Sequence, residues 1–236
     1  MNLNSKKDTV FLILAGFFIT NAIVAELIGG KLVTFFGTFT QSIGIVMWPV
    51  VFIVTDLVNE YYGQKGVRKL SFITVGLIAF TFITLYICMA IPATNFSPVS
   101  DAAFKQVFGQ SSRIILASIC AFIVSQLVDS SIFWMLREKS GKKMMWLRST
   151  GSTIISQLID TFIVQFGAFV LPGIWTINEF AVNASYGYVF KLLVAIAVIP
   201  IIYLVHFLID KYLGEELSHD VIKHTAEENL HHKIKE

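Results

Sequence analysis

Long apolar stretches alternate with short polar segments along most of the chain. Six of the stretches are about 20 residues long, the length that a helix needs to cross the hydrocarbon core of a bilayer. The first follows two lysines, as in a signal peptide, but it is too long for one and lacks a small-residue cleavage site. The pattern therefore predicts an all-α, polytopic integral membrane protein with six transmembrane helices. They lie near Val10–Ile28, Ile43–Tyr61, Leu70–Ile91, Arg113–Leu136, Ser149–Leu171 and Tyr186–Ile209.

Composition agrees with this fold class. Of the 236 residues, 55% are hydrophobic and 14% are charged, whereas soluble domains carry about 25% charged residues. We expect one transmembrane domain over residues 1–213 and a charged cytoplasmic tail over residues 214–236. Cys88 and Cys120 fall in apolar stretches, so we interpret them as small buried side chains rather than as a disulfide or a metal pair. No cofactor is predicted.

Basic residues are distributed unevenly among the connecting segments. The N-terminus, the second loop, the fourth loop and the C-terminal tail together hold 14 of the 18 Lys and Arg residues. The positive-inside rule then places both termini in the cytoplasm. The basic fourth loop, residues 137–148, is expected to lie against anionic lipid headgroups. On the opposite side, Asp101–Phe108 is expected to form a short interfacial helix.

A polar hexapeptide occurs twice inside the apolar stretches, as Ser125–Ser130 (SQLVDS) and Ser156–Thr161 (SQLIDT). An ionisable residue in a transmembrane helix costs roughly 2.5–3.5 kcal/mol on insertion scales, so its presence requires a reason. At a spacing of three or four, Ser, Gln and Asp share one face of a helix. The two copies therefore indicate polar stripes that face a bundle interior or a water-filled cavity. They lie on consecutive spans and resemble a local inverted repeat.

Further acids and amides can be placed by depth within the predicted spans. No Lys or Arg lies deep in any span, because Lys191 is placed at the outer end of the sixth. We therefore expect that internal salt bridges do not balance the acids, which are instead protonated, hydrogen-bonded or reserved for a ligand. The candidate ligand-binding residues are Asp160, Gln157, Asp129, Gln126, Asp56, Asn59, Glu60 and Glu26.

A structural role is the alternative to ligand binding for these polar residues. Polar groups can simply join transmembrane helices through hydrogen bonds, which average about 0.6 kcal/mol. That role suits Ser125, Ser156 and Thr161, and for Gln126 and Gln157 both roles stay open. It suits the aspartates less, because joining helices requires no ionisable group. The four tryptophans lie near predicted span ends, as an interfacial aromatic belt requires.

The order of several short motifs in the chain resembles that of the YhhQ family of queuosine precursor transporters. The resemblance covers roughly residues 10–210. Its first hallmark is Thr55–Gly63 (TDLVNEYYG) followed by Arg68. Its second hallmark comprises Val107–Gly109, Arg113–Ile114, Ala117–Ser118, both hexapeptides, Lys142, Trp146–Arg148 and Ser152.

The resemblance implies uptake of 7-deazaguanine precursors of queuosine across the bacterial cytoplasmic membrane, and no direct contact with nucleic acid. The residues fit such a ligand, because a guanine-like edge offers two N–H donors to a carboxylate and a carbonyl to an amide. We expect Asp160 or Asp129 to bind the donor edge, with Gln157 and Gln126 beside it. Asp56, Asn59 and Glu60 would form a cytoplasmic gate or a second wall, with Glu26 as a further candidate. A homodimer is compatible with so small a bundle.

Two other functions stay open. Substrate-binding subunits of vitamin-type transporters that need a separate ATPase module also have six spans, although their Ala-x-x-x-Ala docking pattern is absent from Val10–Ile28. An intramembrane aspartyl protease would use two aspartates, but neither Asp129 nor Asp160 has the expected Gly-x-Gly-Asp context. The sequence contains no Walker, HExxH or GxSxG motif. These observations favour a transporter over an enzyme.

Overall fold

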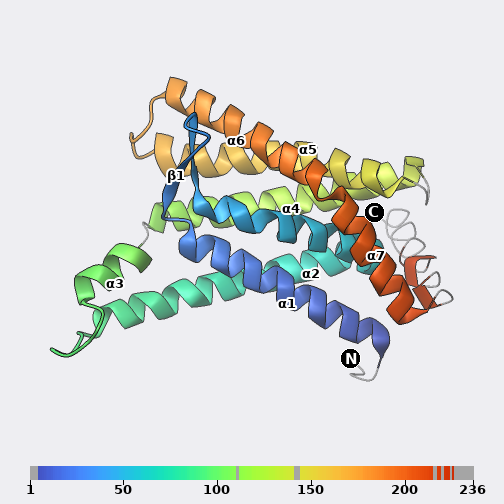
Figure 1. The fold of residues 1–236 in the computed structure, drawn as a ribbon, viewed down its shortest axis with the longest axis horizontal. Coiled ribbons are helices and arrows are strands. Elements are labelled where there is room, and N and C mark those ends of the chain that lie inside the picture. Colours follow the sequence, from blue (N-terminus) through green and yellow to red (C-terminus); the bar gives the residue numbers. More distant parts are fainter. Residues whose placement is uncertain are drawn as a thin grey trace.

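The computed structural model describes residues 5–109, 112–140, 144–214, 217–218, 221–223 and 225. In this part of the chain, five helices are long and apolar enough to cross a membrane. They lie side by side along the long axis of the molecule (Figure 1). In chain order, the elements are α1 (Lys6–Ile28), β1 (Leu32–Phe35), β2 (Phe39–Ser42), the 3₁₀-helix η1 (Ile43–Met47), α2 (Trp48–Ala90), α3 (Asp101–Phe108), α4 (Ser112–Ser140), α5 (Met145–Gln165), the π-helix η3 (Phe166–Val170), α6 (Ile177–Ala197) and α7 (Ile199–Leu213).

The second and third predicted spans form one helix, α2, which has 43 residues. A straight helix of this length would be about 65 Å long, more than twice the ~30 Å of a hydrocarbon core. The helix breaks at Gly63, whose φ of 68° and ψ of −174° are not helical, and the chain turns back there (Figure 1). Glycine adopts this positive φ without the steric cost that a side chain would add. The predicted loop between these spans is therefore wrong, and six crossings remain a prediction.

The last predicted span, Tyr186–Ile209, has the wrong bounds. Helix α6 begins at Ile177, where the Thr176 side chain accepts a hydrogen bond from the Glu179 amide and the Glu179 carboxylate accepts one from the Thr176 amide. This capping box starts the helix nine residues before the predicted span. Helix α6 ends at Ala197 and α7 begins at Ile199, with Pro200 in its first turn. As a result, Lys191 lies about 21 Å along α6 rather than at its outer end.

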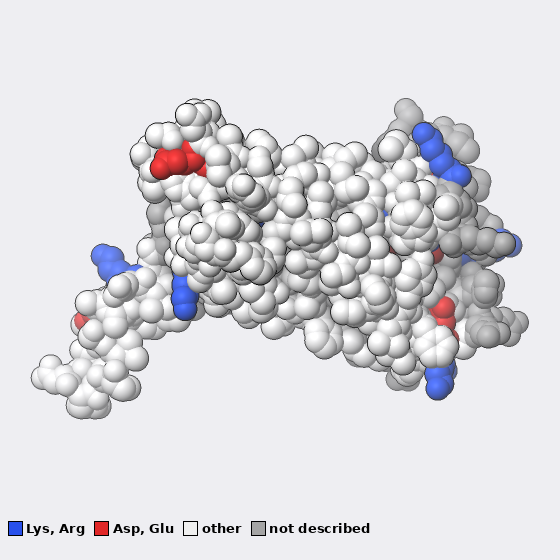
Figure 2. All heavy atoms as spheres, turned by 45° about the horizontal axis from the view of Figure 1, so that its top comes forward, with Lys and Arg blue, Asp and Glu red and all other residues white. Residues whose placement is uncertain are grey.

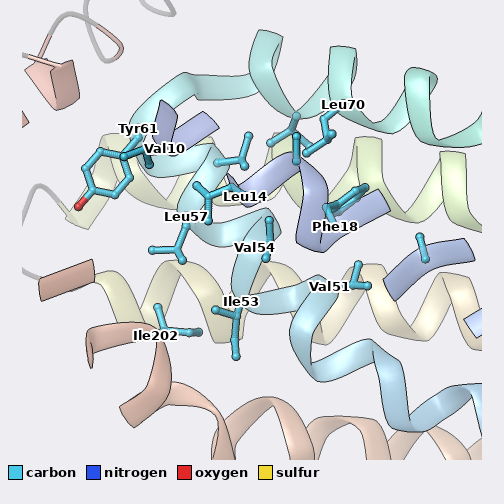
Figure 3. Close-up of a cluster of buried hydrophobic side chains, with 14 of the residues drawn as sticks. Val10, Leu14, Phe18, Val51, Ile53, Val54, Leu57, Tyr61, Leu70 and Ile202 are labelled. Carbon is cyan, nitrogen blue, oxygen red and sulfur yellow. The ribbon is translucent and has the colours of Figure 1, made fainter. Parts of the chain in front are cut away.

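The apolar core joins α1, both halves of α2 and α7. Val10, Leu14 and Phe18 of α1 lie among Val51, Val54, Leu57 and Leu70 of α2, with Ile202 of α7 below them (Figure 3). The α1 residues recur every four positions and so form one stripe of the helix. This packing fixes α1 against α2, which positions the far end of α1 beside the polar residues described below.

The outer surface is apolar between two charged ends. Most charged side chains visible in Figure 2 lie toward the two ends of the long axis, with uncharged surface between them. Large exposed side chains such as Phe17, Phe80 and Leu193 lie on this belt. Cys88 and Cys120 are free thiols, as expected, but both are exposed and not buried. An apolar belt of this kind matches contact with lipid rather than with water.

Two smaller elements lie outside the long helices. Helix α3 has the bounds expected from the sequence, Asp101–Phe108, and the Ser100 side chain caps it. The hairpin of β1 and β2 was not predicted. Its strands pair antiparallel from Leu32–Ser42 to Phe35–Phe39, and Phe36 and Gly37 make the turn with positive φ values of 52° and 68°. The fold class is therefore all-α with one added hairpin.

The start of α1 and the end of α7 lie together. The ammonium of Lys6 donates a hydrogen bond to the Tyr212 carbonyl at 3.0 Å. The first and the last helix of the bundle therefore have their outer termini on the same side of the molecule. That this side faces the cytoplasm remains a prediction. Most of the predicted tail, residues 214–236, lies outside the described residues. Of its described positions, Val221 is buried and Thr225 donates a hydrogen bond to the Tyr61 carbonyl at 3.0 Å.

Candidate functional site

A cavity of about 110 Å³ lies between the end of α1, the hairpin, the end of α5 and the middle of α6. Two predicted site residues, Glu26 and Asp160, line it, and Lys191 lines it beside them. The walls also include two tryptophans, two glutamines and a threonine that the prediction did not assign to a site. These are Trp48, Trp175, Gln41, Gln165 and Thr161.

An ion pair lies in the wall of the cavity. The Lys191 ammonium is 2.7 Å from Asp160 Oδ2, and both side chains are buried. The ammonium also lies over the Trp48 ring, 5.4 Å from its centroid, which adds a cation–π attraction. The other oxygen of Asp160 accepts a long hydrogen bond of 3.5 Å from Ser125. We expected that no internal salt bridge would balance the acids, and for Asp160 this expectation is wrong. Helix α6 starts earlier than predicted and therefore places Lys191 at this depth.

The second carboxylate of the cavity comes from α1. Glu26 accepts a hydrogen bond from the Ser118 hydroxyl of α4. Glu26 and Asp160 therefore face a common space that holds one ammonium, that of Lys191. Carboxylate oxygens that face a region of low dielectric constant favour a ligand that brings N–H donors.

Two buried polar atoms of the cavity wall lack a hydrogen-bond partner among the described residues. They are Gln165 Oε1 and Thr161 Oγ1, and their side chains are at most 5% exposed. A buried acceptor without a partner costs about 1–3 kcal/mol. A ligand with matching donors would recover this free energy. Thr161 and Gln165 lie four and eight positions after Gln157, so the polar stripe of the second hexapeptide continues along α5. This spacing in the sequence could have identified both residues as candidates for the site.

Aromatic side chains form another part of the wall. Phe169 and Trp175 stack with their ring centroids 4.2 Å apart and their planes at 22°. Phe169 belongs to η3, where the helix widens to a π-helix at the end of α5. Such π-helical turns occur frequently at functional sites. Trp48 and Trp175 were assigned to an interfacial belt, but here they line the cavity together with Phe169.

The hairpin closes one side of the cavity through amide groups. Gln41 Nε2 donates to the Asn183 carbonyl at 3.0 Å, and Gln165 Nε2 donates to Gln41 Oε1 at 3.2 Å. The Thr40 amide donates to the Asn183 side chain at 3.2 Å. These contacts connect β2 to α5 and α6, and the Gln41 side chain lies against Gly187. The sequence offered no hydropathy signal for this contact.

Gly187→Ala is expected to displace the hairpin. A Cβ at this position would lie 2.4 Å from Gln41 Nε2, so the Gln41 side chain must move and break its contacts with Asn183 and Gln165. Hydrogen exchange should then become faster at residues 32–42, while the long helices keep their protection. Gly16→Ala is the matched control, because nothing lies within 4 Å of its Cβ. Equal exchange in both variants would contradict the closure role of Gln41.

The two hexapeptides contact each other crosswise. Ser156 donates to Asp129 at 2.9 Å, and Ser125 of the first copy lies 3.5 Å from Asp160 of the second. Each serine therefore serves the aspartate of the other copy. This reciprocity follows because α4 and α5 are antiparallel neighbours that present the same polar stripe to each other. The sequence repeat is thus a two-fold arrangement of side chains in space.

Most of the remaining predicted site residues form a separate cluster, here called the polar network, on α2, α4 and α5. Ser149 donates to Asp56, Ser130 to Asn59 at 2.8 Å, and Thr55 to Gln126 at 3.3 Å. The polar network comprises Asp56, Asn59, Glu60, Gln126 and Asp129, with Arg137 and Arg148, and none of these residues lines the cavity. Gln157 is buried on α5, also outside the cavity lining, and its Oε1 lacks a hydrogen-bond partner among the described residues.

Two buried arginines hold Glu60 in this network. Arg148 lies 3.1 Å and Arg137 lies 3.5 Å from the Glu60 carboxylate. Arg148 is 1% exposed and also lies over the Phe133 ring, 5.5 Å from its centroid. The predicted basic loop at 137–148 is therefore wrong at both of its ends, because these two arginines turn inward instead of facing lipid headgroups.

Comparisons with known proteins give the family. The profile described as "Putative vitamin uptake transporter" matches residues 42–205. A protein of Bacillus subtilis (strain 168), named "Probable queuosine precursor transporter", is 35% identical over 177 residues, which are 73% of this chain and 74% of that protein. The "Queuosine precursor transporter" of Escherichia coli (strain K12) is 26% identical over 159 residues, which are 67% of this chain and 69% of that protein.

A Haemophilus influenzae relative, also named "Probable queuosine precursor transporter", is 26% identical over 53% of this chain and 51% of that protein. No solved structure matches. With its apolar helices, the chain is a multi-pass protein of the bacterial inner membrane. Since the profile spans more than half of the chain and the Bacillus subtilis protein matches most of it, the chain belongs to the "Putative vitamin uptake transporter" family, as its resemblance to the YhhQ family predicted.

Proposed function

We propose that this chain imports 7-deazaguanine precursors of queuosine, such as the 7-cyano and 7-aminomethyl compounds, and binds them in the cavity between α1, α5 and α6. The observation that carries the proposal is a cavity lined by two carboxylates and the Lys191 ammonium, in a family with relatives named queuosine precursor transporters. Intramembrane ionisable residues mark substrate pathways by default. The activity is transport and not catalysis.

The chemistry of the wall matches a guanine-like edge. The two N–H donors of that edge would face the carboxylates of Asp160 and Glu26, and its carbonyl would accept from the Lys191 ammonium. Gln165 Oε1 and the Thr161 hydroxyl are the buried polar atoms that such a ligand would satisfy. The aromatic side chains of Trp48 and Trp175 would flank the planar ring system.

The cavity is small. Sites for drug-sized ligands usually measure about 300–1,000 Å³, whereas this cavity measures about 110 Å³. We therefore place only the planar base of the ligand inside it.

We further propose that the polar network acts as a gate on the other half of the path. Its ion pairs join Glu60 of α2 to Arg137 of α4 and Arg148 of α5. These contacts hold three helices together, and a passage between them opens only when the pairs rearrange. Asp129 and Gln126 would then be gate residues rather than first contacts of the ligand.

Uptake by proteoliposomes that contain only this purified chain tests the function. Vesicles with the protein reconstituted in their membrane should take up radiolabelled 7-aminomethyl-7-deazaguanine. Unlabelled 7-cyano-7-deazaguanine should compete for this uptake, whereas adenine should not. Empty vesicles provide the background. If uptake requires an added ATPase module, the chain is a substrate-binding subunit, and the proposal of an independent transporter fails. If neither compound binds in a direct assay, the ligand class is wrong.

A further inference from the structure

We propose that the groove between α1, α2 and α7 binds one acyl chain of an anionic phospholipid, whose headgroup contacts Lys6 and Lys211. The site is distinct from the transport cavity and does not depend on which solute is carried. The groove lies on the lipid-facing surface of the bundle, near the first residues of α1 and the last residues of α7.

The groove is open to the hydrocarbon and almost entirely apolar. It has a volume of about 500 Å³. Ile13 and Phe17 of α1 and Leu208 of α7 line it and are 54%, 58% and 52% exposed. Val54 and Leu57 of α2 form part of its buried lining. A hollow of this kind does not stay empty in a bilayer, because dispersion contacts with a lipid chain are lost wherever a gap remains.

The length of the groove fits one lipid chain better than a helix of a second copy. On α1 it runs from Thr9 to Phe17, about 12 Å along the helix axis. One leaflet contributes about half of the ~30 Å hydrocarbon core. The groove therefore covers the depth of one leaflet, whereas a transmembrane helix of a partner would need a contact across both.

The basic end of the groove supplies charge complementarity. The Lys6 ammonium contacts the Tyr212 carbonyl at 3.0 Å and lies 5.6 Å from the centroid of the Tyr212 ring, which itself lines the groove. Lys211 lies next to it in the last turn of α7. Both lysines are exposed, so their ammonium groups can reach a phosphate.

Nearby acids do not cancel this charge completely. Asp210 accepts from the Tyr61 hydroxyl at 2.5 Å and pairs with His206 at 2.9 Å, so it is directed into the bundle. Asp8 lies in the first turn of α1, where Lys7 follows Lys6. The ammonium groups of Lys6 and Lys211 therefore lie at the mouth of an apolar groove, which is the arrangement that an anionic phospholipid requires.

Native mass spectrometry of protein released from bilayers tests this site. The bilayers contain equal amounts of phosphatidylglycerol and phosphatidylcholine. Wild-type protein should retain phosphatidylglycerol preferentially. The variant Lys6→Gln/Lys211→Gln should lose that preference, on the order of fivefold for each lysine. Lys105→Gln on α3 removes an exposed lysine far from the groove and should retain the wild-type preference. An unchanged preference in the double variant would overturn the proposal.

Filling the groove tests the acyl-chain contact separately. Ile13→Trp should reduce retention of both lipids, because the indole occupies the space of the chain. Ile83→Trp is the matched control, since Ile83 of α2 is 59% exposed and lies outside the groove. If Ile13→Trp instead abolishes a dimer and leaves the retained lipid unchanged, the groove is an interface between two copies and the lipid proposal is wrong.

Discussion

Asp160→Asn is expected to abolish uptake of 7-deazaguanine precursors. The substitution removes the partner of the Lys191 ammonium, which lies 2.7 Å from Asp160 and is buried. Breaking a buried ion pair on one side costs about 3–5 kcal/mol, because the remaining charge has no partner. The proposed ligand also loses one of its two carboxylates. Uptake into proteoliposomes and the melting temperature of the purified protein measure the two effects.

The double variant Asp160→Asn/Lys191→Met separates stability from binding. With both charges absent, no unpaired ion stays in the cavity wall, so the melting temperature should return toward the wild-type value. Uptake should stay absent because the carboxylate is still missing. Asp101→Asn, on the exposed helix α3, should change neither quantity. Wild-type uptake by the double variant would show that Asp160 serves only to pair with Lys191.

Arg148→Met is expected to destabilise the bundle by about 3–5 kcal/mol, the range for removing one partner of a buried ion pair. Arg148 is 1% exposed and its guanidinium lies 3.1 Å from Glu60. After the substitution, Glu60 retains Arg137 at the longer distance of 3.5 Å. The side chain of Met fills part of the space, so the expected loss comes from the weaker pairing of the buried Glu60 carboxylate.

Thermal unfolding in detergent, followed by tryptophan fluorescence, measures this loss. Arg68→Met is the matched control, because Arg68 also belongs to the family motifs but is exposed. An exposed charge contributes at most about 1 kcal/mol, so the control should melt close to wild type. If Arg148→Met has the same melting temperature as the control, the network does not hold α2, α4 and α5 together.

The sequence alone was sufficient for the features that depend on contiguous residues. Apolar length predicted the membrane class, and five of the six predicted spans coincide closely with α1, η1 with the first half of α2, the second half of α2, α4, and α5 with η3. The bounds of α3 were also correct, because Ser100 and Gly109 delimit it locally. The family motifs identified the class of transporter. Each of these features is a property of neighbours along the chain.

The candidate site was predicted only in part. Glu26 and Asp160 line the cavity, but Gln126 and Asp129 lie in the polar network instead, and Gln157 is buried on α5 outside the cavity. The hydrophobic pattern gives the face of a helix and its approximate depth. It does not say which neighbouring helix that face meets, so the two clusters of acids could not be told apart.

Tertiary structure decided which polar groups became partners. Lys191 reaches Asp160 because the capping box at Thr176 starts α6 early, so the lysine lies well inside the helix rather than at its outer end. Gln165 meets Gln41 across 124 residues of sequence, and the hairpin that carries Gln41 has no transmembrane signal. Hydropathy is a sum over adjacent residues, so it determined which segments enter the membrane. An ion pair or an amide contact depends on distances between segments, and only the packed bundle determined those.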